Sequence, residues 1–241
     1  MNRSIRERAI DPLQYDRDEL LWSEEGHGLS PIRRVFLEKL QPHFGDLIGK
    51  DVLDVGCGQG WLSHNLVEHG ARVTAIDPSV KNIKAATSQF RDVRFVKSSL
   101  QDFRTDHNYD LITAVMVFEH LPKLEESLSQ IKGLLNAGGR LLTIIGDFDK
   151  FTQPRHGYTV DTEEISHDEV ATRTDYGERS GVMYDINRTI PRFTCEADKA
   201  GFLVSEHEPM PAPDWLVDEV PRYSVHNGEP LFHLLELTSD S

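Results

Sequence analysis

The sequence predicts an α/β protein whose doubly wound, mostly parallel sheet has seven strands. Three observations predict it. Short apolar runs alternate with amphipathic helical stretches from residue 50 to residue 147, a glycine-rich turn follows the first run, and the last two runs have no helix between them. Apolar strands that alternate with helices form a parallel sheet covered on both faces. Two strands without a crossover helix pair antiparallel, so the last strand is expected to run against the others.

The core elements follow from their residue patterns. Helices are expected at 61–69, 79–90 and 123–136. Gly70 ends the first helix, Ser79 caps the second, and Gly138-Gly139 closes the third. Strands are expected at the short apolar runs 51–55, 72–76, 93–96, 109–115 and 140–145. Residues 50–147 therefore form the core.

Two further segments are expected to join this core within one domain of residues 1–241. Residues 1–45 should form a helical cap, because Ser30 and Pro31 are a cap and a first helical residue. Residues 148–188 break the alternation of strands and helices. We interpret them as an irregular insertion that shapes a substrate pocket, because long irregular segments of compact domains are usually functional.

The C-terminal segment, residues 189–241, is expected to contain a helix and a β-hairpin. The helix covers 189–200 and is stopped by Gly201. The two strands are expected at 202–205 and 231–237. No helical pattern follows the second of these strands.

The composition is that of an acidic globular protein. Its 40 Asp and Glu residues outnumber 26 Lys and Arg, for a formal net charge of −14, and a field of that sign repels phosphate backbones and anionic lipids. We therefore expect neither a nucleic-acid nor a membrane partner. The chain has two cysteines, no signal-peptide pattern and no apolar run of the roughly 20 residues that span a bilayer, so it is expected to be cytoplasmic.

Half of the net charge lies in residues 206–241, where eight acidic side chains accompany Arg222 as the one basic residue. We interpret this run as a solvated face, with a charge-selective pocket as the alternative. Within it, residues 209–230 carry Trp215 and Tyr223 and form either a second wall of the pocket or a dimer contact. The oligomeric state stays open, with a homodimer as one alternative.

The glycine-rich turn is the strongest single feature. Gly56, Gly58 and Gly60 have the spacing GxGxG, which lets the backbone turn tightly and approach a ligand closely. A dinucleotide fingerprint requires GxGxxG, whereas residue 61 is Trp61, so a smaller ligand is favoured. Asp77 follows Gly56 by 21 positions, where a carboxylate can accept both hydroxyls of a ribose.

Four motifs together identify a family. They are VLDVGCGQG at 52–60, AIDPS at 75–79, YDLITAVMVFEHL at 109–121 and LLNAGGRLLTI at 134–144. This set resembles class I S-adenosylmethionine-dependent methyltransferases, which implies a Rossmann-like fold. Residues 22–26 and 31–34 are also similar to the ubiquinone-biosynthesis O-methyltransferases, and that closer resemblance fades after about residue 147.

The resemblance implies S-adenosylmethionine as the cofactor of residues 50–147. The expected contacts are Asp54, Gly56, Cys57, Gly58 and Gly60 for its methionine end, Asp77 and Pro78 for the ribose, Ser99 and Leu100 for the adenine, Val115 and Met116 for its face, and Arg34 for its carboxylate. The family often has Asp at the position of Ser99, so adenine contacts there are expected to rest more on backbone groups.

Methyl transfer is an in-line displacement, so the protein must hold acceptor and methyl group close together and exclude water. If the acceptor is a hydroxyl, a base must take its proton, and the candidates are His120, His156 and Tyr184, in that order. An amine acceptor needs no dedicated base. A structural role is the alternative for His120, and Cys57 is interpreted as a small buried residue of the turn rather than a nucleophile.

The insertion is expected to line the pocket for a small organic acceptor. No metal site is expected, because neither HExxH nor CxxC occurs, with His156 and His167 left as alternative ligands. The polar and aromatic candidates for acceptor binding are Phe151, Arg155, His156, Tyr158, Tyr176, Tyr184, Asp185 and Arg188.

The sequence thus predicts an enzyme that transfers a methyl group from S-adenosylmethionine to a small-molecule acceptor. The acceptor group is expected to be a hydroxyl or an amine. The alternative is a cofactor-binding protein without transfer activity, acting as a sensor or a partner subunit.

Overall fold

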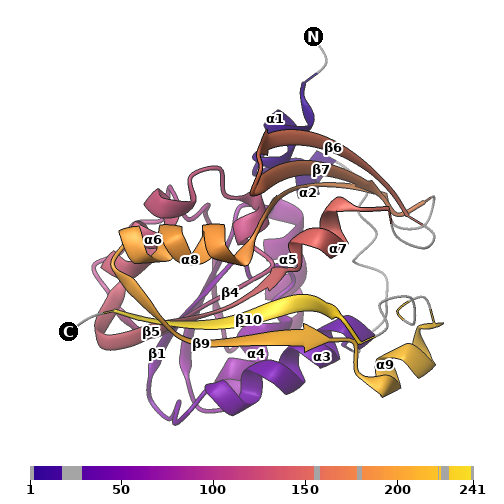
Figure 1. The fold of residues 1–241 in the computed structure, drawn as a ribbon. Coiled ribbons are helices and arrows are strands. Elements are labelled where there is room, and N and C mark those ends of the chain that lie inside the picture. The colour runs from indigo at the N-terminus through magenta and orange to yellow at the C-terminus, as the bar shows by residue number, and fades with distance from the viewer. Residues whose placement is uncertain are drawn as a thin grey trace.

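A sheet of seven strands forms the centre of the molecule, with helices on both sides (Figure 1). The structure is a computed structural model that describes residues 3–17, 29–154, 158–177, 181–221, 223 and 228–239. The strands of the central sheet are β1 (Asp51–Val55), β2 (Arg72–Asp77), β3 (Arg94–Lys97), β4 (Tyr109–Val115), β5 (Leu135–Gly146), β9 (Phe202–Pro211) and β10 (Pro230–Ser239). Their order across the sheet is β3-β2-β1-β4-β5-β10-β9.

The pairing of these strands confirms the predicted doubly wound sheet. β1 to β5 run parallel, with Leu53 of β1 opposite Thr74 of β2 and Ile112 of β4. β10 is antiparallel to β5 and β9, with His233 opposite Ile145 and Pro209. The chain moves outward from β1 on one side through β2 and β3, and on the other through β4 and β5. A crevice therefore opens between the carboxyl ends of β1 and β4.

Helices cover both faces of the sheet, because successive apolar side chains of each strand point to opposite faces. On one face, α3 (Pro31–Leu40), α4 (Trp61–Glu68) and α5 (Val80–Gln89) pack in a core that includes Val52 and Leu111. On the other face, α6 (Leu124–Gly133) and α8 (Ile190–Lys199) pack in a core that includes Leu53 and Ile112. Shorter helical turns are α1 (Ile5–Ala9), α2 (Gln14–Arg17), η1 (Gln41–His43), η2 (Phe118–His120), α7 (Phe148–Thr152) and α9 (Asp214–Glu219).

Two strands are longer than their apolar runs indicate. β5 begins at Leu135 instead of residue 140, because Leu135 pairs with Tyr109 of β4 ahead of an irregularity in the ladder. β9 continues to Pro211 instead of residue 205, because β10 supplies backbone partners along its whole length. Pairing with a neighbour extends each strand past the end of its apolar pattern.

The insertion after β5 is a second sheet, not the irregular segment that we expected. Its three antiparallel strands are β6 (Thr159–Ser166), β7 (Glu169–Asp175) and β8 (Val182–Arg188). These strands are rich in threonine and charged residues. Threonine favours strands, but the segment lacks the strong apolar alternation by which a strand is predicted from sequence. Ala9 of α1 packs against Tyr184 and Ile186 of β8, and Figure 1 shows α1 beside this sheet.

Candidate functional site

A cavity of about 1140 Å³ lies at the carboxyl ends of β1, β2 and β4, where the strand order reverses. Its walls come from the turn after β1, the end of β2, the loop after β4, the segment joining α1 to α2, the start of α3, β8 and the residues around the start of β10. Small-molecule pockets typically measure roughly 300–1,000 Å³. This cavity therefore has room for two small molecules side by side.

The glycine-rich turn between β1 and α4 forms one wall. Gly56, Cys57 and Gly58 line the cavity. Gly58 has φ +53°, and a Cβ built there would meet nothing within 4 Å, so the turn leaves open space for a ligand. Gly60 has φ +84°, and its Cβ would lie 2.6 Å from the Phe95 ring. Gly60 thus serves close packing of the turn, while Gly58 borders the ligand space.

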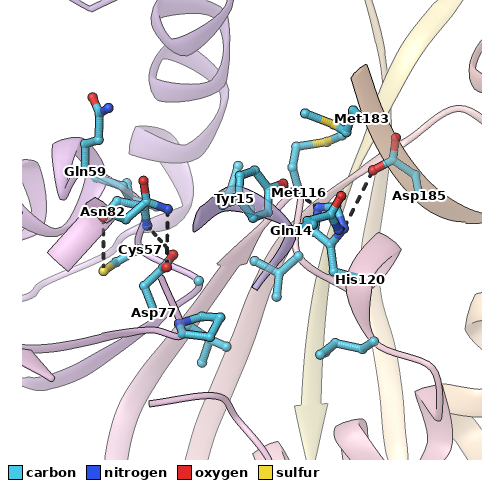
Figure 2. A pocket seen from close by; sticks show the side chains of 18 of the residues that line it. Gln14, Tyr15, Cys57, Gln59, Asp77, Asn82, Met116, His120, Met183 and Asp185 are labelled. Atoms are coloured by element: carbon cyan, nitrogen blue, oxygen red, sulfur yellow. Dashed lines mark hydrogen bonds and ion pairs between the residues drawn. The ribbon is translucent and has the colours of Figure 1, made fainter. Parts of the chain in front are cut away.

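Asp77, at the end of β2, stands beside this turn. Its Oδ2 accepts a hydrogen bond from the Gly58 backbone N–H at 2.9 Å, and its Oδ1 accepts from the Ser79 backbone N–H at 2.8 Å and from Asn82 Nδ2 at 3.2 Å. Burial raises the pKa of the Asp77 carboxyl above its ordinary value. The side chain is thereby fixed in one orientation at the rim of the cavity (Figure 2).

Asp54, the last acidic residue of β1, is held by two hydroxyl groups. Ser63 Oγ donates to Asp54 Oδ2 at 2.6 Å, and Thr113 Oγ1 donates to Asp54 Oδ1 at 2.7 Å. Burial raises the pKa of Asp54 to about 6, against the lowering effect of these hydrogen bonds. Asp54 lines the cavity, and its hydrogen bond with Thr113 links it to β4.

The structure brings most of the other predicted cofactor residues to the same cavity. Cys57 is buried, and burial raises the pKa of its thiol well above the ordinary value, as expected for a space-filling cysteine. Met116 has φ +56°, an uncommon backbone conformation for a residue other than glycine. The further predicted residues that line the cavity are Pro78, Ser99, Leu100 and Val115.

Arg34 lies elsewhere. Its guanidinium pairs with Glu219 of α9 at 2.8 Å and stacks over the Trp215 ring at 4.2 Å from the ring centroid. The preceding residue, Arg33, lines the cavity instead. Successive residues of a helix point in directions about 100° apart, so the first turn of α3 turns only one of these two arginines toward the site.

Tyr184 is a further predicted residue that does not line the cavity. The Tyr184 hydroxyl accepts a hydrogen bond from Arg8 Nη1 at 2.9 Å, on the face of β8 opposite Met183 and Asp185, which line the cavity. His156 lies outside the described residues. Alternation along β8 therefore turns Tyr184 toward α1.

His120 follows β4 and meets three side chains at the cavity wall (Figure 2). Tyr15 Oη lies 2.7 Å from its Nε2, Gln14 Nε2 lies 3.3 Å from its Nδ1, and Asp185 Oδ1 lies 3.7 Å from Nδ1. Burial lowers the pKa of His120 to about 4, so the imidazole is neutral at pH 7. Tyr15 and Gln14 could not be predicted from the sequence, because α2 is only four residues long and no periodic pattern marks it.

The small sheet and the C-terminal segment complete the walls. Arg188 does not line this cavity, because its guanidinium is buried against Glu169 and the carbonyl oxygens of Phe118 and Leu121. The wall residues from these segments are Phe151, Tyr158, Tyr176, Met183, Asp185, Val220, Tyr223, Leu231 and Phe232. Part of residues 209–230 is thus the second wall that we considered.

The acidic C-terminal run forms ion pairs and does not face the cavity. Its described acidic residues do not occur among the cavity-lining residues, and Glu219 and Glu236 pair with Arg34 and Arg140. Most of these pairs are partly exposed, so each contributes little to stability. The run is a solvated, ion-paired face, as the sequence analysis expected.

Comparison with known proteins finds a matching family for part of the chain. Residues 53–141, which hold the turn, Asp77 and His120, match the family described as "Methyltransferase domain". The chain shares the fold of S-adenosylmethionine-dependent methyltransferases. Among the solved structures, an S-adenosylmethionine-dependent methyltransferase from Mesorhizobium loti has a TM-score of 0.69 at 16% identity, over 87% of this chain and 100% of that chain. A glycopeptide N-methyltransferase solved with S-adenosylmethionine has a TM-score of 0.64 at 14% identity, over 86% of this chain and 93% of that chain.

The curated relatives carry a more specific name. A ubiquinone biosynthesis O-methyltransferase of Rickettsia bellii is 31% identical over 135 residues, which cover 52% of this chain and 56% of the relative. One of Nitrosospira multiformis is 34% identical over 119 residues, covering 47% of this chain and 48% of the relative. The chain thus spans only about half the length of the curated relatives that it matches.

Within the described ranges of the chain, no group of three or more His, Cys, Asp and Glu residues is arranged to hold a metal ion. The exposed His167 pairs with Asp168 at 3.8 Å. None of the helices in the described part of the chain combines the length and apolar character that crossing a membrane requires.

Proposed function

We propose that this chain transfers a methyl group from S-adenosylmethionine to a small-molecule acceptor. The observation that carries the proposal is the position of Asp77, whose carboxylate is fixed against the Gly58 backbone at the rim of a cavity large enough for two ligands. A carboxylate in that place can accept the hydroxyl hydrogens of a ribose. The open space at Gly58 leaves room for the chain that continues from the ribose.

The residues present fit this cofactor. Asp77 would hold the ribose, Ser99 and Leu100 would border the adenine, and the backbone of residues 56–58 would border the methionine end. Met116 would lie against the reacting centre, at the end of β4. Bound S-adenosylmethionine supplies an electrophilic methyl group on a positively charged sulfur.

The rest of the cavity suits an organic acceptor. Its walls beyond the cofactor residues are mainly aromatic and apolar, including Phe151, Tyr158, Tyr176 and Phe232, with a few polar groups. Such walls exclude water and hold a planar or apolar molecule close to the methyl group, which is the main requirement of an in-line displacement.

We infer that the acceptor group is a hydroxyl, and that an amine is the second candidate. The support for oxygen is that the curated relatives are named O-methyltransferases at about 30% identity. The support for nitrogen is weaker, since one structural neighbour is a glycopeptide N-methyltransferase at 14% identity.

The test is an assay of S-adenosylhomocysteine release with S-adenosylmethionine and a panel of phenols, amines and carboxylic acids, followed by mass spectrometry of the products. Release that depends on an acceptor, with a product heavier by one methyl group, supports the proposal. Cofactor binding without turnover of any acceptor would instead favour a cofactor-binding protein that lacks transfer activity.

A further inference from the structure

Helix α9 packs against helix α3 at the surface of the molecule (Figure 1). Arg34 of α3 contacts two side chains of α9. Its Nη1 donates to Glu219 Oε1 at 2.8 Å and Oε2 at 3.0 Å, and its guanidinium lies 4.2 Å from the centroid of the Trp215 ring. Trp215 Nε1 in turn donates to Glu38 Oε2 of α3 at 3.2 Å. We call these four side chains, Arg34, Glu38, Trp215 and Glu219, the α3–α9 latch.

The spacing of the latch residues places them on facing surfaces of the two helices. Arg34 and Glu38 are four residues apart on α3, and Trp215 and Glu219 are four residues apart on α9, so each pair shares one face of its helix. Leu216 of α9 is fully buried in the same core as the inner face of α3. Leu216 therefore anchors α9 to the core, and the latch holds its outer side.

The two helices that the latch joins also carry parts of the cavity wall. Ile32 in the first turn of α3 lines the cavity, and so do Val220 and Tyr223, which follow α9 directly. Val220 and Tyr223 pack against the core cluster that contains Phe151 and Phe232, two walls of the acceptor part of the cavity. A shift of α9 would therefore change the acceptor part of the cavity.

The latch is weak compared with the core beneath it. The side chains of Arg34 and Glu219 are 42% and 44% exposed. An exposed ion pair and an exposed cation–π contact each contribute only modestly, because water competes for both charges. Loss of the latch is thus expected to loosen α9 without unfolding the chain.

We propose that Arg34 is a positioning residue for the acceptor. By holding α9 against α3, it keeps Val220 and Tyr223 in place as a wall of the acceptor part of the cavity. The proposal rests on the proposed methyl transfer. It gives a role on the acceptor side to an arginine that the sequence resemblance assigns to the cofactor carboxylate. Because salt screens exposed charges, the position of this wall should also depend on ionic strength.

The first test needs neither cofactor nor acceptor. Hydrogen–deuterium exchange of the whole chain, read by mass spectrometry, compares the peptide that contains α9 with the peptide that contains α4. In Arg34→Ala the amides of α9 should exchange about fivefold faster or more, and those of α4 should exchange as in the wild type. Unchanged exchange of α9 would overturn the proposal.

Lys123→Ala provides the matched control for this test. It removes an exposed ion pair with Glu126 on α6, at 2.8 Å, which has no part in the latch. The exchange of both peptides should be unchanged in this variant. Faster exchange of α9 in Lys123→Ala as well would show that losing any surface ion pair loosens α9, and would contradict the latch.

The second test uses an acceptor identified by the release assay. Arg34→Ala should raise the KM of that acceptor about fivefold or more and leave kcat within about twofold, because the wall binds the acceptor but does not take part in the displacement. Lys123→Ala should change neither constant. A lower kcat with an unchanged acceptor KM in Arg34→Ala would contradict the positioning role.

Salt separates the latch from a general loss of stability. Raising the ionic strength from about 0.1 M to about 1 M shortens the screening length from about 10 Å to about 3 Å. The acceptor KM of the wild type should therefore approach that of Arg34→Ala as salt is added. A ratio of the two KM values that stays constant over this range would overturn the proposal.

Calorimetric titration with S-adenosylmethionine distinguishes this proposal from the proposed function. The wild type and Arg34→Ala should bind equally, because Arg34 does not line the cavity. If the wild type does not bind S-adenosylmethionine, the proposed function fails. If the wild type binds it and turns over, but Arg34→Ala keeps the wild-type acceptor KM, only the proposed role of Arg34 fails.

Discussion

Asp16 Oδ1 accepts a hydrogen bond from the Ser79 hydroxyl at 2.6 Å, although 63 residues separate the two in the chain. The same carboxylate accepts from the backbone N–H groups of Val80 and Lys81 at 3.2 Å each, so it occupies the N-terminus of α5. Ser79 also donates its backbone N–H to Asp77. The N-terminal segment is thereby anchored next to Asp77, the residue that we propose binds the ribose.

Asp16→Ala should lower the free energy of unfolding by about 1 kcal/mol, the usual cost of losing a group that caps a helix N-terminus. Burial alone would raise the pKa of Asp16, but the hydrogen bonds from Ser79 and α5 outweigh it and lower that pKa. A carboxyl with a lowered folded pKa stabilises the protein above its unfolded pKa and loses this effect as the pH falls through the folded pKa.

The effect of Asp16→Ala should therefore be complete at pH 7 and shrink below about pH 4. Denaturant unfolding at several pH values measures it, with Asp106→Ala, at an exposed aspartate, as the control. A loss of stability equal to that of the control would show that the anchor contributes nothing.

The raised pKa of Asp54 predicts the opposite pH dependence of the free energy of unfolding. Burial raises its pKa to about 6, above the unfolded value of about 3.9. Between these values the folded state binds more protons than the unfolded state, so the free energy of unfolding falls as the pH rises, by roughly 3 kcal/mol for a shift of about two units. Asp54→Asn should remove this slope in the cofactor-free protein.

The measurement for Asp54 is the difference in unfolding free energy between the wild type and Asp54→Asn from about pH 4 to pH 7. The asparagine should keep contact with Ser63 and Thr113, since hydroxyl groups can donate or accept. A difference that stays constant across this range would mean that Asp54 does not have a raised pKa.

Gly58 and Gly60 should respond differently to alanine. Gly60→Ala should cost about 2 to 4 kcal/mol of stability, because it combines a positive φ with a Cβ 2.6 Å from Phe95. Gly58→Ala should cost only about 1 kcal/mol, because only the positive φ is unfavourable. Its methyl group would enter the cavity, so Gly58→Ala should mainly weaken cofactor binding. Thermal unfolding and calorimetry together check the pair, and equal stability losses would contradict the account.

Arg33 and Arg34 provide a second matched pair. Arg33 lines the cavity, whereas Arg34 pairs with Glu219 and stacks on Trp215. Arg33→Ala should weaken S-adenosylmethionine binding by about tenfold, the cost of losing one charge-assisted hydrogen bond. Arg34→Ala should leave that affinity unchanged, and calorimetric titration of both variants measures it. The reverse ranking would restore Arg34 as the carboxylate ligand.

The strands and the turn of the core could be predicted because their signals are local. β1 and β4 are apolar runs with the same bounds in sequence and structure. The glycine-rich turn begins directly after β1, and Asp77 is the last residue of β2. The contacts of His120 could not be predicted, because Tyr15 lies 105 residues away on a helix of one turn. Tyr184 is expected from the sequence at the acceptor pocket but lies on the opposite face of β8 from Met183 and Asp185, because the sequence pattern did not predict strands in the insertion.

The most direct test of the central claim is calorimetric titration of the purified chain with S-adenosylmethionine and S-adenosylhomocysteine, with Asp77→Ala beside the wild type. We expect both ligands to bind the wild type at micromolar concentration, and Asp77→Ala to lose about 1 to 3 kcal/mol of binding free energy because two ribose hydroxyls lose their partner. No binding of either ligand, together with binding of NAD, would contradict the account and indicate a dinucleotide site at the glycine-rich turn.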